Sequence, residues 1–522
     1  MDTKALRRKI LDLAIRGQLV PQDPADEPAS VLLDRIRAEK QKMVKEGKLK
    51  AKDIKNDSII FVGEDSLHYE KFADGSVKCI EDEIPFELPE GWAWARLGTV
   101  FSTVTGDTPS TKDASLYGTD YPFYKPTDLD AGYNVCGAED SVSEKGYLSG
   151  RPLPKFSVLV TCIGATIGKT GYISNAGICN QQINAVLPNS EVLSDYTYFC
   201  MCSQYEQEQI WTNSSATTLP ILNKSKFDNL LFPIPPHEQQ SRIVERIKGL
   251  FFFVEKVQSN QESLKTTVGI AKSKILDLAI RGQLVPQDPN DEPASVLLER
   301  IRAEKEELIK QGKIKRDNKE SVIFRGEDNS YYLRTGKLVE SLEDWRFDAL
   351  PETWELCCLG DVCDYGDCIN VDTADIADDA WILDLEDIEK DTGAVIKKVT
   401  KAQRSSASTK HRFYSGQVLY SKLRPYLNKV VLSDADGYCT SEIIPLKFDR
   451  CVLPEYARYY LMSPTFLAYA DRCSYGVKMP RMGTADGKKA IIPLPPLVEQ
   501  KRIAKTIELL FSQLTRISEA LV

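Results

Sequence analysis

The chain contains one helical segment twice, 265 residues apart. Residues 9–40 read KILDLAIRGQLVPQDPADEPASVLLDRIRAEK, and residues 274–305 read KILDLAIRGQLVPQDPNDEPASVLLERIRAEK. When the alignment is extended to 9–50 and 274–315, 34 of the 42 positions are identical. Self-similarity of this kind means that one structural unit is used twice. The chain is therefore expected to fold as two copies of a single arrangement.

The rest of the chain repeats more weakly, at an offset of 260 residues. SVLVTCIGATIGK (157–169) aligns with QVLYSKLRPYLNK (417–429), and PIPP (233–236) aligns with PLPP (493–496). By these two offsets Val522 corresponds to Glu262 and Met1 to Thr266. The end of the chain thus resumes almost where its beginning starts, which predicts a cyclic, pseudo-two-fold repeat that is opened in the middle of one element.

That element is predicted to be a long helix, because its seam positions recur in alternating steps of four and three, the a/d spacing of a coiled coil, and among those of the central helix only Gln261 is polar. The seam, which we also assign to coiled-coil pairing and partner docking, consists of Ile243, Ile247, Leu250, Val254, Val257, Leu264, Val268, Ala271, Ile275 and Leu278, with Ile503, Ile507, Leu510, Leu514, Ile517 and Leu521 near the C-terminus and Leu6, Ile10 and Leu13 near the N-terminus. We predict that the central helix packs antiparallel to a composite of the two chain ends. The alternative is a set of separate amphipathic helices, each docked on its own domain.

Two globular domains lie between the helical parts. Both mix β-rich runs with glycine and proline turns and a short helix-like stretch, which is typical of the α+β class. The expected parts are a helical region at 1–50, a connector at 51–85, a globular domain at 86–236, a central helical region at 237–318, a connector at 319–347, a second globular domain at 348–496 and a C-terminal helix at 497–522.

The net charge of −9 by itself argues against a nucleic-acid partner. The charge is unevenly distributed, however. Residues 145–190 contain no acid and four basic residues, and residues 392–433 contain no acid and nine basic residues. We interpret these overlapping repeat positions as a face that approaches phosphates, since a carboxylate there would repel them. A buried apolar region is the alternative for 157–187, but nine cations cannot all be buried.

Side chains able to read bases occur at equivalent positions of the two domains. Asn180-Gln181-Gln182 of the first domain aligns with Thr440-Ser441-Glu442 of the second. Because these groups bind different base edges, one scaffold would read two sequences. Turn residues that satisfy the local backbone are an equally good interpretation of any one of them. The candidate DNA contacts are Lys169, Gln181, Gln182, Lys224, Lys422, Arg424, Lys429, Ser441, Lys478 and Arg481.

Motifs for catalysis are missing from the sequence. CIGATIGKTG (162–171) is one residue too short for a nucleotide-binding loop, and its repeat equivalent KLRPYLNKVV has no glycine. The cysteines at 357, 358, 363 and 368 cluster, but the chain has only three histidines, so reduced thiols are favoured over a zinc site. The acids between 384 and 389 are interpreted as a solvated turn rather than a nuclease site. With no membrane-spanning run and no secretory signal, a cytoplasmic location is expected.

Several of these features together resemble the specificity (S) subunit of bacterial type I restriction–modification systems. They are two variable domains alternating with two near-identical helical regions, LPEGW-like entries, P-x-P-P exits followed by Gln-x-Arg-Ile, and the AIRGQLVPQDP tract. The resemblance implies a non-catalytic DNA-reading subunit. Each globular domain would be a target recognition domain that reads one half of a bipartite, asymmetric site on double-stranded DNA.

The resemblance also implies partners. The helical regions would space the two domains and dock two methyltransferase (M) subunits, and through them restriction (R) subunits. S-adenosylmethionine, ATP and Mg²⁺ would be bound by these partners, with no cofactor in this chain. The competing interpretation, a tandem coiled-coil scaffold that binds proteins only, explains the helices but not the acid-free segments.

Overall fold

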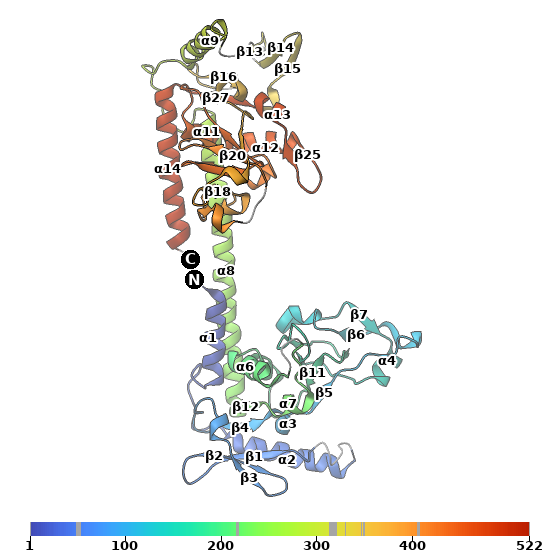
Figure 1. Cartoon of the computed structure of the whole chain (residues 1–522). Helices are drawn as coiled ribbons and strands as arrows, with labels where there is room; N and C mark the ends of the chain where they lie inside the picture. The colour runs from blue at the N-terminus through green and yellow to red at the C-terminus, as the bar shows by residue number, and fades with distance from the viewer. Residues whose placement is uncertain are drawn as a thin grey trace. The chain divides into compact units, whose positions relative to one another are not determined.

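The computed structural model describes residues 2–47, 54–215, 219–312, 321–328, 330–345, 347, 350–404 and 408–520. The chain divides into two compact units, unit 1 (Met1–Asn260) and unit 2 (Gln261–Val522). The division falls inside the 44-residue helix α8 (His237–Ile280), so its first part belongs to unit 1 and its last part to unit 2 (Figure 1). This point lies within two residues of Glu262, the residue at which the sequence repeat closes on itself.

In unit 1 the N-terminal helix α1 (Thr3–Ile15) runs antiparallel to the first part of α8 (Figure 1). The Asp2 carboxylate caps α1 by accepting from the backbone N–H groups of its first turn. Arg7 Nη2 lies 3.1 Å from Glu255 Oε1, whereas farther along the chain Asp26 forms an ion pair with Arg242. The contacts therefore proceed in opposite directions along the two segments.

In unit 2 the C-terminal helix α14 (Leu497–Ala520) runs antiparallel to the last part of α8. Lys272 Nζ donates to Thr515 Oγ1 at 3.3 Å, and Arg502 Nη2 lies 2.6 Å from Asp291 Oδ2 just beyond α8. The predicted antiparallel pairing of the central helix with both ends of the chain is confirmed, one half in each unit.

Burial along the helices departs from a strict coiled-coil seam. The fully buried seam residues Ile243, Ile247, Ile503 and Ile507 lie in the cores of the globular domains. For these turns the alternative prediction, a helix docked on its own domain, is the better description. Ile517 is 49% exposed, and Leu521 lies outside the described residues. Apolar spacing alone did not distinguish contact with a partner helix from contact with a sheet.

The globular domain of each unit combines small sheets with short helices, which confirms the α+β class. In unit 1 the strands are β4 (Ala93–Arg96), β5 (Thr103–Thr105), β6 (Tyr117–Tyr124), β7 (Asp140–Val142), β8 (Val158–Thr161), β9 (Thr170–Tyr172), β10 (Ile178–Cys179), β11 (Ile183–Val186) and β12 (Leu231–Ile234). The helices there are α3 (Leu97–Val100), α4 (Glu144–Ser149), α5 (Ser194–Met201), α6 (Gln204–Asn213) and α7 (Lys224–Asp228).

In unit 2 the strands are β16 (Glu355–Cys358), β17 (Ile369–Val371), β18 (Trp381–Leu383), β19 (Val399–Thr400), β20 (Lys410–Phe413), β21 (Val418–Ser421), β22 (Val430–Leu432), β23 (Gly437–Thr440), β24 (Ile443–Leu446), β25 (Ser474–Tyr475), β26 (Arg481–Met482) and β27 (Ile491–Leu494). The helices are α10 (Leu359–Val362), α11 (Pro454–Leu461), α12 (Pro464–Arg472) and α13 (Thr484–Lys489).

The two globular domains have the same fold, as the 260-residue offset predicts. Strand order β11-β8-β9 in unit 1 matches β24-β21-β22 in unit 2, and the parallel pair β10–β6 matches β23–β18. Buried hydrogen bonds are also repeated: Tyr196 donates to the Pro233 carbonyl at 2.9 Å, and Tyr456 to the Pro493 carbonyl at 2.6 Å. The prediction that the chain repeats one unit is therefore confirmed for the fold of each unit.

The helical repeat continues into a second helix and a three-stranded meander in both units. These elements are α2 (Ala29–Lys45), β1 (Ser58–Val62), β2 (His68–Phe72) and β3 (Val77–Cys79), repeated as α9 (Ala294–Lys310), β13 (Ser321–Arg325), β14 (Tyr331–Thr335) and β15 (Leu338–Ser341). No described helix is both long enough and apolar enough to cross a bilayer.

The LPEGW-like entries hold each globular domain against its long helices. Trp92 Nε1 donates to Gln239 Oε1 at 2.9 Å in unit 1, and Trp354 Nε1 donates to Glu499 Oε2 at 3.0 Å in unit 2. Gly17 follows α1 with φ +65°, and a Cβ there would lie 2.4 Å from the Pro89 side chain. Only glycine satisfies both the left-handed backbone and this close approach, which explains why the second copy of the tract also has a glycine here, Gly282, with φ +69° and the Pro351 side chain at the same 2.4 Å.

Candidate nucleic-acid interface

The glycine-rich run 162–171 is part of a hairpin and not of a phosphate-binding loop. It joins β8 to the antiparallel strand β9, and the Thr161 N–H donates to the Lys169 carbonyl at 2.9 Å to close the turn. A nucleotide loop requires a strand followed by a helix. Unit 2 repeats the hairpin with Ser421 donating to the Lys429 carbonyl at 3.2 Å.

The backbone of this hairpin is preserved while its side chains differ. Gly164 and Gly168 have φ of +99° and +86°, and the residues at the equivalent positions, Arg424 and Asn428, also lie in the left-handed region at +49° and +50°. Left-handed backbone is unfavourable for a side chain such as that of arginine. Non-glycine residues in this region concentrate at functional sites, so Arg424 marks the hairpin as a candidate contact surface.

In unit 2 the fold brings this hairpin against a second one, formed by β25, β26 and the loop between them. We call residues 474–482 the recognition hairpin. The Arg424 N–H donates to the Pro480 carbonyl at 2.7 Å, and the Met482 N–H donates to the Lys422 carbonyl at 3.0 Å. Two pairs of candidate contacts that lie more than fifty residues apart in the sequence thus share one surface: Lys422 with Arg424, and Lys478 with Arg481.

The other unit 2 candidates lie differently. Ser441 is exposed and precedes Glu442, whose carboxylate binds Arg481. Lys429 is turned away from the recognition hairpin, because its Nζ donates to the Leu385 carbonyl at 2.6 Å. Burial lowers the pKa of Lys429. The structure therefore groups Ser441 with the recognition hairpin and separates Lys429 from it.

In unit 1 the candidates form a less charged surface. The Gly164 N–H donates to the Pro220 carbonyl at 3.0 Å, repeating the contact between the two hairpins. Gln182 accepts at 3.0 Å from Asn180 Nδ2, and Gln181 accepts at 2.6 Å from Thr108. Lys169 lies 2.6 Å from Asp130, and Lys224 forms an ion pair with Asp228 across one turn of α7. Both lysines are therefore partly neutralised.

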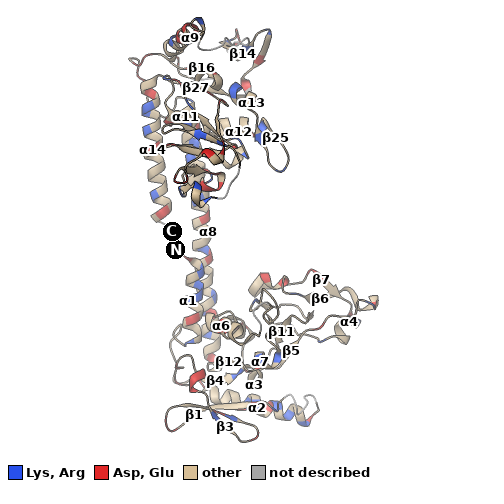
Figure 2. Cartoon of the chain, viewed as in Figure 1, with Lys and Arg blue, Asp and Glu red and all other residues tan. Residues whose placement is uncertain are grey.

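An acid-free stretch of sequence is not an acid-free surface in this protein. Within 392–433, Lys398 pairs with Asp434, Lys401 with Asp378, and Arg404 and Lys410 with Asp384. In unit 1, Lys145 pairs with Asp113, and Arg151 with Asp107. Figure 2 shows acidic and basic residues interspersed over both globular domains. The expectation of an extended basic face is corrected by these through-space pairs, because the acids come from other parts of the chain.

The acids at 384–387 are structural. Asp384 and Asp387 cap a short 3-10 turn, and Arg404 binds both carboxylates with its own side chain only 10% exposed. Burial would lower the pKa of Arg404, but its hydrogen bonds to Asp384 and Asp387 raise the pKa instead. Within the described residues no His, Cys, Asp or Glu side chains are grouped as a metal site would require, and the thirteen cysteines are free thiols.

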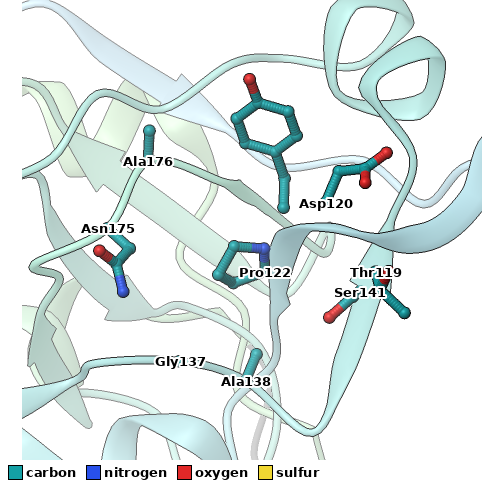
Figure 3. A pocket seen from close by; sticks show the side chains of 9 residues that line it. Thr119, Asp120, Pro122, Gly137, Ala138, Ser141, Asn175 and Ala176 are labelled. Carbon is teal, nitrogen blue, oxygen red and sulfur yellow. The ribbon is translucent and has the colours of Figure 1, made fainter.

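A shallow pocket of about 450 Å³ lies on unit 1 between β6, β7 and the loop before β10 (Figure 3). Its polar lining includes Asp120, Ser141 and Asn175, and the Asn175 amide already donates to the Cys136 carbonyl at 2.6 Å. None of the ten candidate DNA contacts lines this pocket, and the Asp120 carboxylate would repel a phosphate.

Sequence reasoning missed the apolar part of the recognition hairpin. Tyr475 is 64% exposed, Met479 is 47% exposed, and Val477 between them is fully exposed. The signal in the sequence was the run SYGVKMPR, which places apolar and basic residues between a glycine and a proline. Exposed apolar side chains at the tip of a basic hairpin are typical of a surface that contacts a partner.

Comparison with known proteins finds a family match in both units. The family described as "Type I restriction modification DNA specificity domain" matches residues 89–264 and 351–521. The EcoEI type I restriction enzyme specificity subunit of Escherichia coli is 29% identical over 408 residues, 69% of this chain and 61% of the relative. The EcoDI specificity subunit of the same species is 24% identical over 437 residues, 82% of each chain.

The matches with the EcoEI and EcoAI specificity subunits span about three fifths of the length of those relatives. A solved structure described as "Structural basis underlying complex assembly and conformational transition of the type I R-M system" superposes with a TM-score of 0.53 at 17% identity. The superposition covers 84% of this chain and 94% of the other, and it shows a common fold.

Proposed function

Because the chain belongs to the type I restriction–modification DNA specificity family, we propose that it is the non-catalytic subunit that selects the DNA sequence for such a complex. Each globular domain reads one half of a bipartite site on double-stranded DNA. The observation that carries this proposal is the pair of domains with one backbone and different exposed side chains. The common backbone lets both domains bind DNA in the same way, and the different side chains recognise two different base sequences.

The basic cluster of unit 2 supports phosphate binding at the same surface. This cluster consists of Lys478, which is exposed, with Lys422 and Arg424, which are half-buried beside the recognition hairpin. An acidic protein binds DNA when its cations are concentrated where the phosphates lie, since the counterions released there drive association. In this proposal the acids elsewhere on the surface limit binding to the intended face.

The decisive experiment is selection of bound duplexes from random DNA by the chain assembled with its methyltransferase partner. We expect two short conserved blocks separated by unspecified bases. Retained partner binding without any selected sequence would favour the protein-only scaffold. S-adenosylmethionine, ATP and Mg²⁺ belong in this proposal to the methyltransferase and restriction subunits, and the free thiols fit a cytoplasmic location.

A phosphate contact is predicted at Lys478. Lys478→Ala should weaken binding to all sequences alike and reduce the slope of log K against log salt by about one unit, because one counterion fewer is released. Lys398 is the matched control, since it is also an exposed lysine of unit 2 but pairs with Asp434 at 2.7 Å. Titration at several salt concentrations measures both variants. An equal change of slope for the two would contradict the assignment.

We place the methyltransferase subunits on the repeated helical regions. The tract at 21–24 and its copy at 286–289 are identical and exposed, although the globular domains have diverged. Val31 on α2 and Val296 on α9 are likewise identical and exposed, at 41% and 40%. Identical exposed residues in both repeats are what two copies of one partner require.

We expect Val31→Asp to remove one of two methyltransferase copies and Val296→Asp the other, because burying an unpaired carboxylate at an interface weakens association by about tenfold or more. Mass measurement of the assembled complex gives the stoichiometry. Val62→Asp on β1 of unit 1 is the control, since Val62 is also an exposed valine, at 59%, but its repeat equivalent is Arg325. Two bound copies in both the Val31→Asp and Val296→Asp variants would show that the partner docks elsewhere.

A further inference from the structure

One arginine of the recognition hairpin is held by a carboxylate in a way that leaves part of it available. Arg481 Nε donates to Glu442 Oε1 and Oε2 at 3.1 Å, and its Nη2 donates to Oε1 at 3.0 Å. Among the described residues, Arg481 Nη1 has one hydrogen bond, a long one of 3.4 Å to the Met479 carbonyl. The Arg481 side chain is 37% exposed and that of Glu442 is 24% exposed.

The planar geometry of the guanidinium group determines which N–H donors of Arg481 are left after it has bound Glu442. The group has five N–H donors in a rigid plane. Glu442 occupies the edge formed by Nε and Nη2. The end edge, formed by the outer hydrogens of Nη1 and Nη2, is a second parallel pair of donors. A planar pair of this kind matches the O6 and N7 acceptors of guanine in the major groove.

We infer that the recognition hairpin is the base-reading element of unit 2, with Arg481, positioned by Glu442, binding the O6 and N7 atoms of one guanine in its half-site. A two-stranded ribbon fits the major groove of B-form DNA. Glu442 acts as a positioning residue, because it limits the rotation of the guanidinium before DNA arrives. This inference rests on the proposed function and adds a base identity to it.

Two further observations support the assignment. Arg424 contacts the recognition hairpin through its backbone N–H and has a left-handed backbone conformation. Its buried Nε has no hydrogen-bond partner among the described residues. Unpaired buried donors are rare in folded proteins. Beside it, Val477 and Met479 present exposed apolar groups at the hairpin tip, and such groups contact the thymine methyl in the same groove.

Unit 1 supplies a natural internal control. At the positions equivalent to Arg424, Glu442 and Arg481, it has Gly164, Gln182 and Ile221. The arginine–carboxylate pair is thus specific to unit 2. The guanine preference is expected in one half-site only, and variants of the pair should leave the other half-site unchanged.

The test is selection from random duplexes by the full chain assembled with its methyltransferase partner, using wild type, Arg481→Ala and Arg481→Lys. Wild type should select guanine at one position of one half-site, with roughly 5- to 150-fold discrimination. Arg481→Ala should lose that preference, and Arg481→Lys should keep only part of it, since lysine retains the charge and N–H donors but lacks the planar pair. Retention of the other half-site shows that each variant is folded.

Removing the N7 atom of the guanine tests the same contact from the DNA side. Replacing the selected guanine by 7-deazaguanine removes N7, so it should weaken wild type and have little effect on Arg481→Ala. Glu442→Ala should reduce discrimination at this position only, and Glu442→Gln should restore part of it by keeping one acceptor oxygen. The inference is overturned if Arg481→Ala keeps every base preference, or if 7-deazaguanine weakens both proteins equally. A wild type that selects no sequence overturns the proposed function as well.

Discussion

A chain with seven residues inserted into α8 after Asn260 is expected to recognise the same two half-sites separated by a longer gap. The insertion point is the boundary between the units, and the nearest buried residues of α8 are Val254 and Val268. Neither globular core is therefore changed. Seven helical residues add about 10.5 Å of rise, or up to about three base pairs at 3.4 Å per pair.

A heptad is the appropriate length, because it returns the helix to within about 20° of its original phase. Both units then keep their own helix contacts, such as Arg7 with Glu255 and Lys272 with Thr515. We propose that α8 sets the gap while the globular domains set the bases, and this expectation follows from that division. Selection from random DNA measures both properties in one experiment.

The control replaces residues 258–264 with a different heptad of equal length that keeps Gln261 and Leu264 at their seam positions. It should leave the gap unchanged. A gap that stays constant after the insertion, or half-site bases that change with it, would contradict the division of labour between helix and domains. Loss of all binding with intact folding would show that the complex tolerates only one spacing.

The second large effect is expected in a buried ion pair of unit 1. Arg96 Nη2 lies 2.7 Å from Glu70 Oε2, and their side chains are only 7% and 3% exposed. Arg96→Ala should destabilise unit 1 by about 3–5 kcal/mol, because it leaves the Glu70 carboxylate buried without its partner. Amide hydrogen exchange of unit 1 peptides measures this change, and peptides of unit 2 serve as the reference.

Unit 2 shows what the same site looks like without charges. The equivalents of Glu70 and Arg96 are Leu333 and Cys358, and both residues are only 4% exposed. The double variant Glu70→Leu with Arg96→Cys should therefore be neutral or stabilising by up to about 4 kcal/mol, since a packed apolar pair avoids the desolvation of two ions. A double variant as unstable as Arg96→Ala would show that the charges are required for packing.

The pH dependence of stability also distinguishes the wild type from the double variant. Burial would raise the pKa of Glu70, but hydrogen bonds from Arg96 and Ser58 outweigh it and lower the pKa below the ordinary value of 4.5. The stabilisation by ionised Glu70 is thus fully present above pH 4.5 and is lost as pH falls through the lowered folded value. Wild type should lose protection in unit 1 over this acidic range, and the double variant should not show this contribution.

Sequence alone was sufficient for the architecture of this chain. The repeated tract, the two offsets and the alternating steps of four and three predicted two α+β units and an antiparallel pairing of α8 with both chain ends. These features are local: identity between repeats survives in any fold, and helical periodicity depends only on neighbours along the chain. The same reasoning predicted that CIGATIGKTG is a loop whose side chains differ between the repeats while its surroundings stay the same. The equivalent loop of unit 2 has left-handed backbone at the same two positions.

Only the tertiary structure decided which charges are available. Arg404 and Lys410 belong to an acid-free segment, yet both lie against Asp384. Arg481 and Glu442 are thirty-nine residues apart, and they meet because Arg481 pairs with Leu423 just after β21 while Glu442 lies just before β24, the strand that pairs with β21. The physical reason is that a charge is neutralised through space by whatever lies within a few ångströms. Distance along the chain predicts periodicity and repeats, whereas the sign of a surface depends on contacts that only the folded chain creates.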